Sequence, residues 1–210
     1  MGIVPGVSAH ASMRLEGISA IDRYIPIHEA LWEYERRINS NVENPLMAAL
    51  ELPYPVVVGR LEAGQWSSQV PDRLRFEGRV GVRVGESVAG AKAAFEEVVR
   101  GACPEAEISW GGGKFAPAET PTDHPLVEVV GTALARELGR PPELCGFPGG
   151  ADMRLFTARG IPCVMVGTNG LELAHAVNER VSVEDVYKLA RVLARSLVRL
   201  QFGEGLLRTH

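Results

Sequence analysis

The sequence is poor in cysteine, and its three cysteines follow no pattern that indicates a structural site. Cys103, Cys145 and Cys163 are odd in number and widely spaced, and no C-x-x-C pair occurs. A disulfide framework needs paired cysteines, and a thiolate zinc site needs closely spaced ones. We therefore expect neither feature and interpret the three thiols as small buried hydrophobic groups.

Long apolar runs are also absent. No stretch approaches the ~18 consecutive apolar residues that a membrane-spanning helix needs. The first residues, MGIVPGVSAHASMRLEG, lack the basic start and the long apolar core of a signal peptide. We therefore expect a cytoplasmic protein that does not contact a membrane.

Basic residues are not in excess, and this bears on nucleic acid as a partner. The formal net charge is −4 and no basic patch is interleaved with aromatic residues, so we expect no nucleic-acid partner. A basic stripe of Lys188, Arg191, Arg195 and Arg199 is interpreted as the solvated face of a helix. Hydrophobic residues at 46% and charged residues at 23% are ordinary for a globular protein of one or two domains.

The first half of the sequence shows strand and helix periodicity in the order βαββαβ. The expected elements are a strand at 3–12, a helix at 17–39, strands at 53–64 and 73–84, a helix that starts after Ser87 and a strand at 106–110. This order is typical of the split βαβ, or ferredoxin-like, sandwich. We place this domain at residues 1–112.

Periodicity within these segments predicts which side chains face the core. In the first helix, apolar residues recur at spacings of three and four. These residues are Tyr24, Ile27, Leu31, Tyr34 and Ile38. In 73–84, apolar and charged residues alternate, which indicates an antiparallel strand with one wet face. Pro26 predicts a kink or a late start in the first helix.

A segment rich in glycine, proline and threonine, 111–125, predicts a domain boundary, and helices and short apolar strands follow it. The expected elements are helices at 124–139 and 150–160, strands at 143–147 and 161–167, and a last helix that Ser182 and Asp185 cap. Such alternation implies an α/β layer with a mostly parallel sheet. The last helix carries an apolar stripe of Val186, Leu189, Ala190, Leu193, Leu197 and Leu200. We place this α/β domain at residues 113–210.

Four motifs resemble those of a known enzyme family. They are GVSAHAS with EGISAI, VVVGRLEAGQWSSQVPDRLRFEGRVGVRVGES, PGGADMRLF with GIPCVMVG, and LELAHAVNERVSVEDV. In their order and spacing the chain resembles the aminoacylase-like metallopeptidases, which include acetylornithine deacetylase, succinyl-diaminopimelate desuccinylase and carboxypeptidase G. The resemblance implies an α/β catalytic domain with two zinc ions, with cobalt or manganese as alternatives, and an inserted ferredoxin-like lid that forms a homodimer.

The resemblance also implies roles for five residues. His175 matches a metal-binding histidine, and His10 matches a lid histidine that reaches across the dimer and donates to the oxyanion of the scissile carbonyl. Arg154 matches the arginine that holds the substrate carboxylate. Gly167 matches a glycine that lets the backbone approach the substrate. Ser68 stands near the place where many relatives have an asparagine, and its hydroxyl is able to donate a hydrogen bond.

Three of these residues also have a structural interpretation. His175 alone is explained as a satisfied structural histidine, and His10 as a partly exposed strand histidine. Arg154 is alternatively a surface arginine that pairs with Asp152. The surrounding motifs favour the functional role in each case.

Most of the family's metal ligands have no counterpart in the sequence. The resemblance implies a histidine and aspartate pair, a bridging aspartate and two adjacent glutamates, one of them the general base. None of these motifs occurs in the sequence. Glu96 and Glu97 are adjacent, but they fall in the second lid helix. The other histidines fall in a lid helix, a boundary turn and the tail, and are His28, His124 and His210. His175 alone does not make a two-zinc site.

Three explanations stay open. The chain is half of a split hydrolase with a separate N-terminal catalytic half, a fragment prepared without that half, or a degenerate relative. The first predicts a zinc-dependent deacetylase, desuccinylase or peptidase that cleaves the amide of N-acyl amino acids and is inactive alone. The last predicts a non-catalytic dimerisation or small-carboxylate-binding module. A partial sheet with an open edge in 113–210 favours a partner, either the other half or a second copy.

Overall fold

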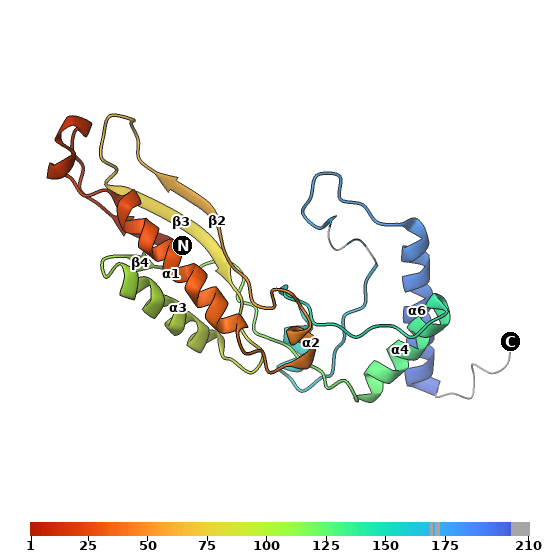
Figure 1. Cartoon of the computed structure of the whole chain (residues 1–210). Helices are drawn as coiled ribbons and strands as arrows, with labels where there is room; N and C mark the ends of the chain where they lie inside the picture. Colours follow the sequence, from red (N-terminus) through yellow and green to blue (C-terminus); the bar gives the residue numbers. More distant parts are fainter. Residues whose placement is uncertain (169, 171–172, 203–210) are drawn as a thin grey trace. The chain divides into compact units, whose positions relative to one another are not determined.

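The computed structural model describes residues 1–168, 170 and 173–202, which form two compact units (Figure 1). The first unit comprises Met1–Pro117 and Cys145–Ala151, and the second comprises Ala118–Leu144 and Asp152–His210. Each unit is described by itself below. The lid and catalytic roles expected for 1–112 and 113–210 stay predictions.

The first unit is built on a four-stranded antiparallel sheet. Its strands are β1 (Gly2–Pro5), β2 (Val56–Ala63), β3 (Arg73–Val80) and β4 (Glu107–Ile108), in the spatial order β2-β3-β1-β4. Helices α1 (Ala20–Asn39) and α3 (Val88–Ala102) make the two crossovers, and Figure 1 shows both running alongside the strands. The predicted βαββαβ order and the split βαβ arrangement are therefore confirmed.

The predicted inward faces form the core of this unit. All five apolar residues expected on one face of α1 are buried, and Ile27 is completely so. Leu74 and Phe76 of β3 are buried beside them, whereas Arg73 and Arg75, which alternate with these two residues, are exposed. The alternation in β3 thus produces one apolar face, which α1 and α3 cover, and one charged face.

Several predicted boundaries in the first unit are wrong; strand β3, for example, ends at Val80 instead of at residue 84. Helix α1 begins at Ala20, ahead of Pro26, because the Ser19 hydroxyl accepts a hydrogen bond from the Asp22 N–H at 3.1 Å and caps the helix. Strand β1 ends at Pro5 instead of continuing to residue 12. Beyond it only isolated bridges pair Val7 with Ile18 and His10 with Gln69, and the short 3-10 helix η1 (Ala11–Glu16) follows.

The described part of the second unit contains three helices, α4 (Pro125–Leu138), α5 (Met153–Thr157) and α6 (Val183–Phe202). Helices α4 and α6 pack on one another through Val130, Ala133 and Val192. The Glu137 carboxylate of α4 accepts hydrogen bonds from Arg191 and Arg195 of α6. The prediction that the basic stripe of this helix is its solvated face is therefore wrong.

The mostly parallel sheet predicted for 113–210 is absent from the described residues. Segment 143–147 is not a strand, and residues 145–151 belong to the first unit. Segment 161–167 has no regular secondary structure. A strand exists only when its backbone pairs with a neighbour, and the second unit has no strand among its described residues to supply that pairing. The protein as described is a mixed helix and sheet structure of the α/β class.

None of the helices in the described residues has both the length and the hydropathy needed to span a membrane.

Candidate functional site

His10 lies at an exposed end of the first unit, where η1 begins. Its Nδ1 atom accepts a hydrogen bond from the Ser12 N–H at 3.2 Å and lies 2.8 Å from the Ser12 hydroxyl. The Trp66 ring, also exposed, lies edge-on to the imidazole with the ring centroids 6.4 Å apart. Because a backbone N–H donates to Nδ1, the neutral ring carries its proton on Nε2. The hydrogen bonds of this turn involve Nδ1 and leave the Nε2–H donor out.

Ser68 is held beside His10 by backbone pairing. The Ser68 carbonyl oxygen accepts from the Ala11 N–H at 2.9 Å, and Val70 N–H donates to the Ala9 carbonyl at 2.8 Å. These bonds flank the bridge between His10 and Gln69. The structure thus brings together two of the residues that the resemblance singles out, although they are far apart in the sequence.

Arg154 lies on α5 and makes the ion pair that its structural interpretation predicts. Its guanidinium Nη1 is 2.9 Å from Asp152 Oδ1. The arginine side chain is 19% exposed and the aspartate 79% exposed, so the pair lies at the surface with the guanidinium partly covered. The ion pair is compatible with a substrate-binding role for Arg154. Because Asp152 is exposed, a substrate carboxylate is able to replace it on the guanidinium.

His175 adopts a backbone conformation that is uncommon for residues other than glycine. Its φ is 63°, in the left-handed region, and Asn178 has a φ of 67°. The Glu179 carboxylate accepts a hydrogen bond from the His175 backbone N–H at 3.2 Å and closes this turn. The imidazole is exposed. Gly167 lies in segment 161–167, and among the described residues other than its chain neighbours no atom lies within 4 Å of a Cβ placed on it.

A metal site does not form from the described residues of this chain. Nowhere in residues 1–168, 170 and 173–202 do three or more histidine, cysteine, aspartate or glutamate side chains gather in a way that could hold a metal ion. Two other histidines have structural roles. His124 caps α4 by accepting from the Leu126 N–H at 3.1 Å, and His28 stacks between Tyr24 and Trp32. His210 lies outside the described residues.

The adjacent glutamates of α3 are likewise not a metal pair. Glu96 accepts from the Trp110 indole at 2.6 Å and from Arg100 at 3.0 Å. The sequence predicted that all three thiols are buried. This is confirmed for Cys103, whereas Cys163 is only partly buried and Cys145 is exposed.

Three residues of these sites were not predicted. Trp66 and Gln69 lie beside His10, and Glu179 closes the turn at His175. Glu179 follows His175 by four residues, a spacing visible in the motif HAVNE. No comparable signal identifies Trp66 or Gln69, because their proximity to His10 depends on pairing across the sheet end.

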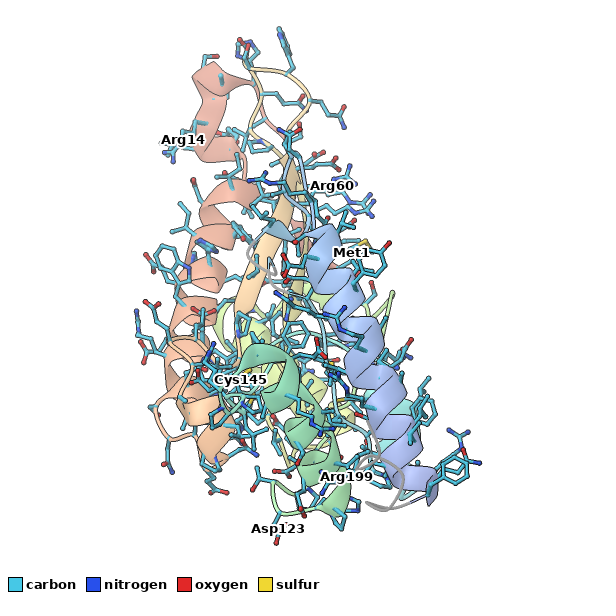
Figure 2. The ribbon with its side chains drawn as sticks, turned by 90° about the vertical axis from the view of Figure 1, so that its right-hand side faces the viewer. Met1, Arg14, Arg60, Asp123, Cys145 and Arg199 are labelled. Carbon is cyan, nitrogen blue, oxygen red and sulfur yellow. The ribbon has the colours of Figure 1, made fainter. Side chains whose placement is uncertain are left out.

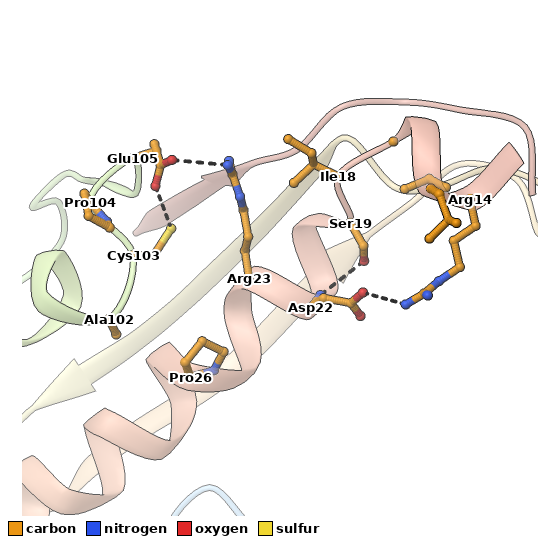
Figure 3. A pocket seen from close by; sticks show the side chains of 13 residues that line it. Arg14, Ile18, Ser19, Asp22, Arg23, Pro26, Ala102, Cys103, Pro104 and Glu105 are labelled. Carbon is orange, nitrogen blue, oxygen red and sulfur yellow. Dashed lines mark hydrogen bonds and ion pairs between the residues drawn. The ribbon is translucent and has the colours of Figure 1, made fainter.

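A separate cavity of about 550 Å³ lies between η1, the start of α1 and the turn after α3 (Figure 3). Arg14 pairs with Asp22 and Arg23 with Glu105, each at 3.1 Å. The Cys103 thiol points to the same glutamate at 3.7 Å. The charged groups in the wall already pair with one another, and none of the five predicted site residues lines this cavity.

The comparisons with known proteins agree with this architecture. Residues 8–199 match peptidase family M20/M25/M40. The uncharacterized protein YqjE of Bacillus subtilis (strain 168) is 31% identical over 144 residues, which are 65% of this chain and 37% of that protein. Succinyl-diaminopimelate desuccinylase of Hydrogenovibrio crunogenus is 33% identical over 84 residues, 40% of this chain and 22% of that enzyme.

Solved structures show the same fold. A tripeptidase from Staphylococcus aureus superposes with a TM-score of 0.63 at 22% identity, over 93% of this chain and 49% of that chain. The chain thus spans about half the length of the solved relative and less of the curated ones. Because the family match extends through both compact units, this chain belongs to peptidase family M20/M25/M40.

Proposed function

We propose that this chain is part of a metal-dependent amidohydrolase that cleaves the amide bond of an N-acyl amino acid, as a deacetylase, desuccinylase or peptidase. The observation that carries the proposal is the family match over residues 8–199, which includes the predicted site residues of both units. The names of the matched relatives, a desuccinylase and a tripeptidase, agree with amide hydrolysis.

His10 is proposed to stabilise the oxyanion that forms on the scissile carbonyl. The turn at Ser12 fixes the tautomer, so Nε2–H faces outward as a donor in an exposed position. A preorganised donor of this kind is worth most where negative charge develops in the transition state. The role requires His10 to reach the active site of a second copy, so the active form is proposed to be a homodimer through the first unit.

Arg154 is proposed to hold the substrate carboxylate in place of Asp152. Its planar guanidinium suits two parallel hydrogen bonds to a carboxylate. Gly167 and Ser68 are proposed to line the substrate, Gly167 through its open backbone position and Ser68 through its hydroxyl.

The described residues do not fit a two-metal site by themselves. His175 is proposed as one ligand of zinc, or of cobalt or manganese, with its exposed ring held at the surface by the turn that Glu179 closes. The remaining ligands, and the general base, are proposed to come from a separate N-terminal catalytic half.

The test uses the chain together with a polypeptide that supplies those ligands, with zinc added. We expect hydrolysis of N-acetyl or N-succinyl amino acids, and a loss of about 100-fold in kcat for His10→Ala. His28→Ala is the matched control and keeps kcat. An unchanged kcat in His10→Ala, or no hydrolysis of any N-acyl amino acid, contradicts the proposal.

The alternative is a non-catalytic dimerisation or small-carboxylate-binding module. It is favoured by the absence of a metal-binding group among the described residues. It predicts that N-acetyl amino acids bind to the chain without metal, that Arg154→Met abolishes this binding, and that His175→Ala has no effect. Titration calorimetry distinguishes the two proposals.

A further inference from the structure

Trp66, in the loop between β2 and β3, exposes most of its indole ring. The side chain is 63% exposed, although tryptophan is highly buried on average. The other two tryptophans have partners, since the Trp110 indole N–H donates a hydrogen bond at 2.6 Å and Trp32 stacks on His28 with the ring centroids 4.7 Å apart. Among the described residues, His10 supplies the one ring that contacts Trp66, and no group accepts from the Trp66 indole N–H. Most of this indole is therefore available to a ligand.

Backbone pairing holds the Trp66 loop against the turn of His10. The Trp66 carbonyl oxygen accepts from the Gln69 N–H at 3.2 Å and closes a turn. Gln69 forms the bridge with His10, and its side-chain amide donates to the Ser8 hydroxyl. In Figure 1 and Figure 2, this loop and η1, whose Arg14 is labelled in Figure 2, lie at the same end of the first unit. The imidazole and the indole are thus presented to a substrate together, within one copy or across a dimer.

The spacing of the two rings suits an acyl group beside the carbonyl that His10 contacts. The ring centroids lie 6.4 Å apart, with the ring planes at 73°. A carbonyl oxygen that accepts from Nε2 lies about 2.9 Å from that nitrogen. Carbon atoms contact an aromatic ring at about 3.5–4.0 Å. An acyl chain of several carbons therefore reaches the indole, whereas the methyl group of an acetyl covers little of it.

We propose that Trp66 is a specificity-determining residue for the acyl group, and that the substrate is an N-acyl amino acid whose acyl group is a long aliphatic chain or an aromatic ring. This inference rests on the proposed function, which assigns the substrate carboxylate to Arg154 and the carbonyl oxygen to His10. The acyl group is then the part of the substrate left for Trp66. Apolar contact between the acyl group and the indole strengthens binding in proportion to the area removed from water.

The surroundings of Trp66 favour an uncharged acyl group over a succinyl group. The polar side chains that pair in the two turns around His10 are all neutral, and they are Ser8, Ser12 and Gln69. Arg14 of η1 belongs to an exposed ion pair and lines the cavity of Figure 3, which neither His10 nor Trp66 lines. A succinyl carboxylate placed against the indole would therefore lose hydration without gaining a cation from these side chains.

The first experiment compares kcat/KM for N-hexanoylalanine, N-succinylalanine and N-acetylalanine in the zinc-loaded assembly used to test the proposed function. We expect kcat/KM for the hexanoyl substrate to exceed that for the acetyl substrate by about tenfold or more, and Trp66→Ala to remove most of this ratio. Trp66→Phe keeps an aromatic ring and is expected to retain most of the ratio. Trp32→Ala is the matched control, because Trp32 is also exposed and also contacts a histidine ring, and it keeps the wild-type ratio.

The ratio of two substrates distinguishes acyl specificity from a role of Trp66 in orienting His10. If Trp66 only orients the imidazole, Trp66→Ala lowers kcat/KM equally for the hexanoyl and acetyl substrates. An unchanged ratio in Trp66→Ala, or a wild-type preference for the succinyl or acetyl substrate, overturns the inference. Either of these results still includes hydrolysis, so the proposed function stands.

The second experiment needs no hydrolysis, because saturation-transfer difference NMR reports which protons of N-hexanoylalanine lie against the protein. We expect the strongest transfer to the hexanoyl methylene and methyl protons, a several-fold smaller transfer in Trp66→Ala and an unchanged transfer in Trp32→Ala. Equal transfer in Trp66→Ala and the wild-type chain overturns the inference. Transfer that depends on Trp66, in a protein that hydrolyses no N-acyl amino acid, contradicts the proposed function and leaves the acyl contact standing.

Discussion

Two buried tyrosines give the first unit a dependence on alkaline pH. Burial raises the pKa of Tyr24. Burial, and then the Glu86 carboxylate, raise the pKa of Tyr34, although Arg37 and Arg83 act in the opposite direction. In both residues the folded state favours the neutral phenol.

The sign of the effect follows from linkage. Because the folded pKa is raised, the contribution to stability is complete below the unfolded value of 10.0 and is lost as pH rises through the folded value. We expect the free energy of unfolding to fall above pH 10, and Tyr24→Phe and Tyr34→Phe each to reduce that fall. Urea unfolding between pH 8 and about 11 measures it. Tyr187→Phe, at an exposed position, is the control that leaves the curve unchanged.

At the same scale, sequence motifs identified only part of the candidate site. His10 and Ser68 were both predicted, and the structure places them side by side because Ala11 pairs with Ser68 and Val70 with Ala9, on either side of the bridge between His10 and Gln69. The contact of His10 with Trp66 was not predicted, since no periodicity reports on which loop reaches which strand end. The left-handed conformation of His175 was also missed, because only a few per cent of residues other than glycine adopt it.

Among the elements, the packing of α4 on α6 depends on one carboxylate. The Glu137 side chain is 8% exposed and lies against two guanidinium groups. Removing its charge leaves Arg191 and Arg195 without their partner in a partly covered position. We therefore expect Glu137→Gln to destabilise the second unit by about 1–3 kcal/mol.

Urea unfolding followed by circular dichroism checks this expectation. Glu184→Gln is the matched control, because Glu184 pairs with Lys188 on the exposed surface of α6. We expect the control to keep the wild-type midpoint. Equal midpoints for Glu137→Gln and the wild-type chain would show that the two arginines are satisfied without Glu137.

Sequence periodicity predicted the helices and strands better than it predicted which of their faces are covered by other parts of the protein. The alternation in β3 and the helical spacing in α1 each identified an element and its buried face, since both faces meet within the first unit. The apolar stripe of α6 was recognised as apolar, yet it is exposed, and Val192 and Ser196 are buried instead. Segment 161–167 has a strand's composition and no strand pairing. Periodicity describes the surface of one segment, whereas burial and strand pairing also depend on the segment that packs against it.

For the whole molecule, the two units differ in the size of their cores. The core of the first unit joins α1 and α3 to the sheet and includes Ile27, Leu31, Leu74 and Val99. In the described part of the second unit the buried side chains are few, Val130, Ala133, Val192 and Ser196. Because stability grows with buried apolar area, the first unit is expected to be the more stable.

We therefore expect two unfolding transitions, with the second unit unfolding first. Native-state hydrogen exchange checks the order, since amides of α4 and α6 exchange in less denaturant than those of α1 and β3. Exchange is measured separately in peptides from each unit, so each unit serves as the internal control for the other. A single transition with equal protection throughout the described helices contradicts this expectation.

The position of β1 in the sheet has a kinetic consequence. The Met1 amino group donates to the Ser109 carbonyl at 2.8 Å across a separation of 108 residues, and β1 lies between β3 and β4. The β2–β3 hairpin is able to form early from local contacts, whereas β1 must wait for residues that leave the ribosome much later. During synthesis the earliest strand is thus the one that stays unpaired longest, and it is the segment of this sheet on which a chaperone has the most time to act.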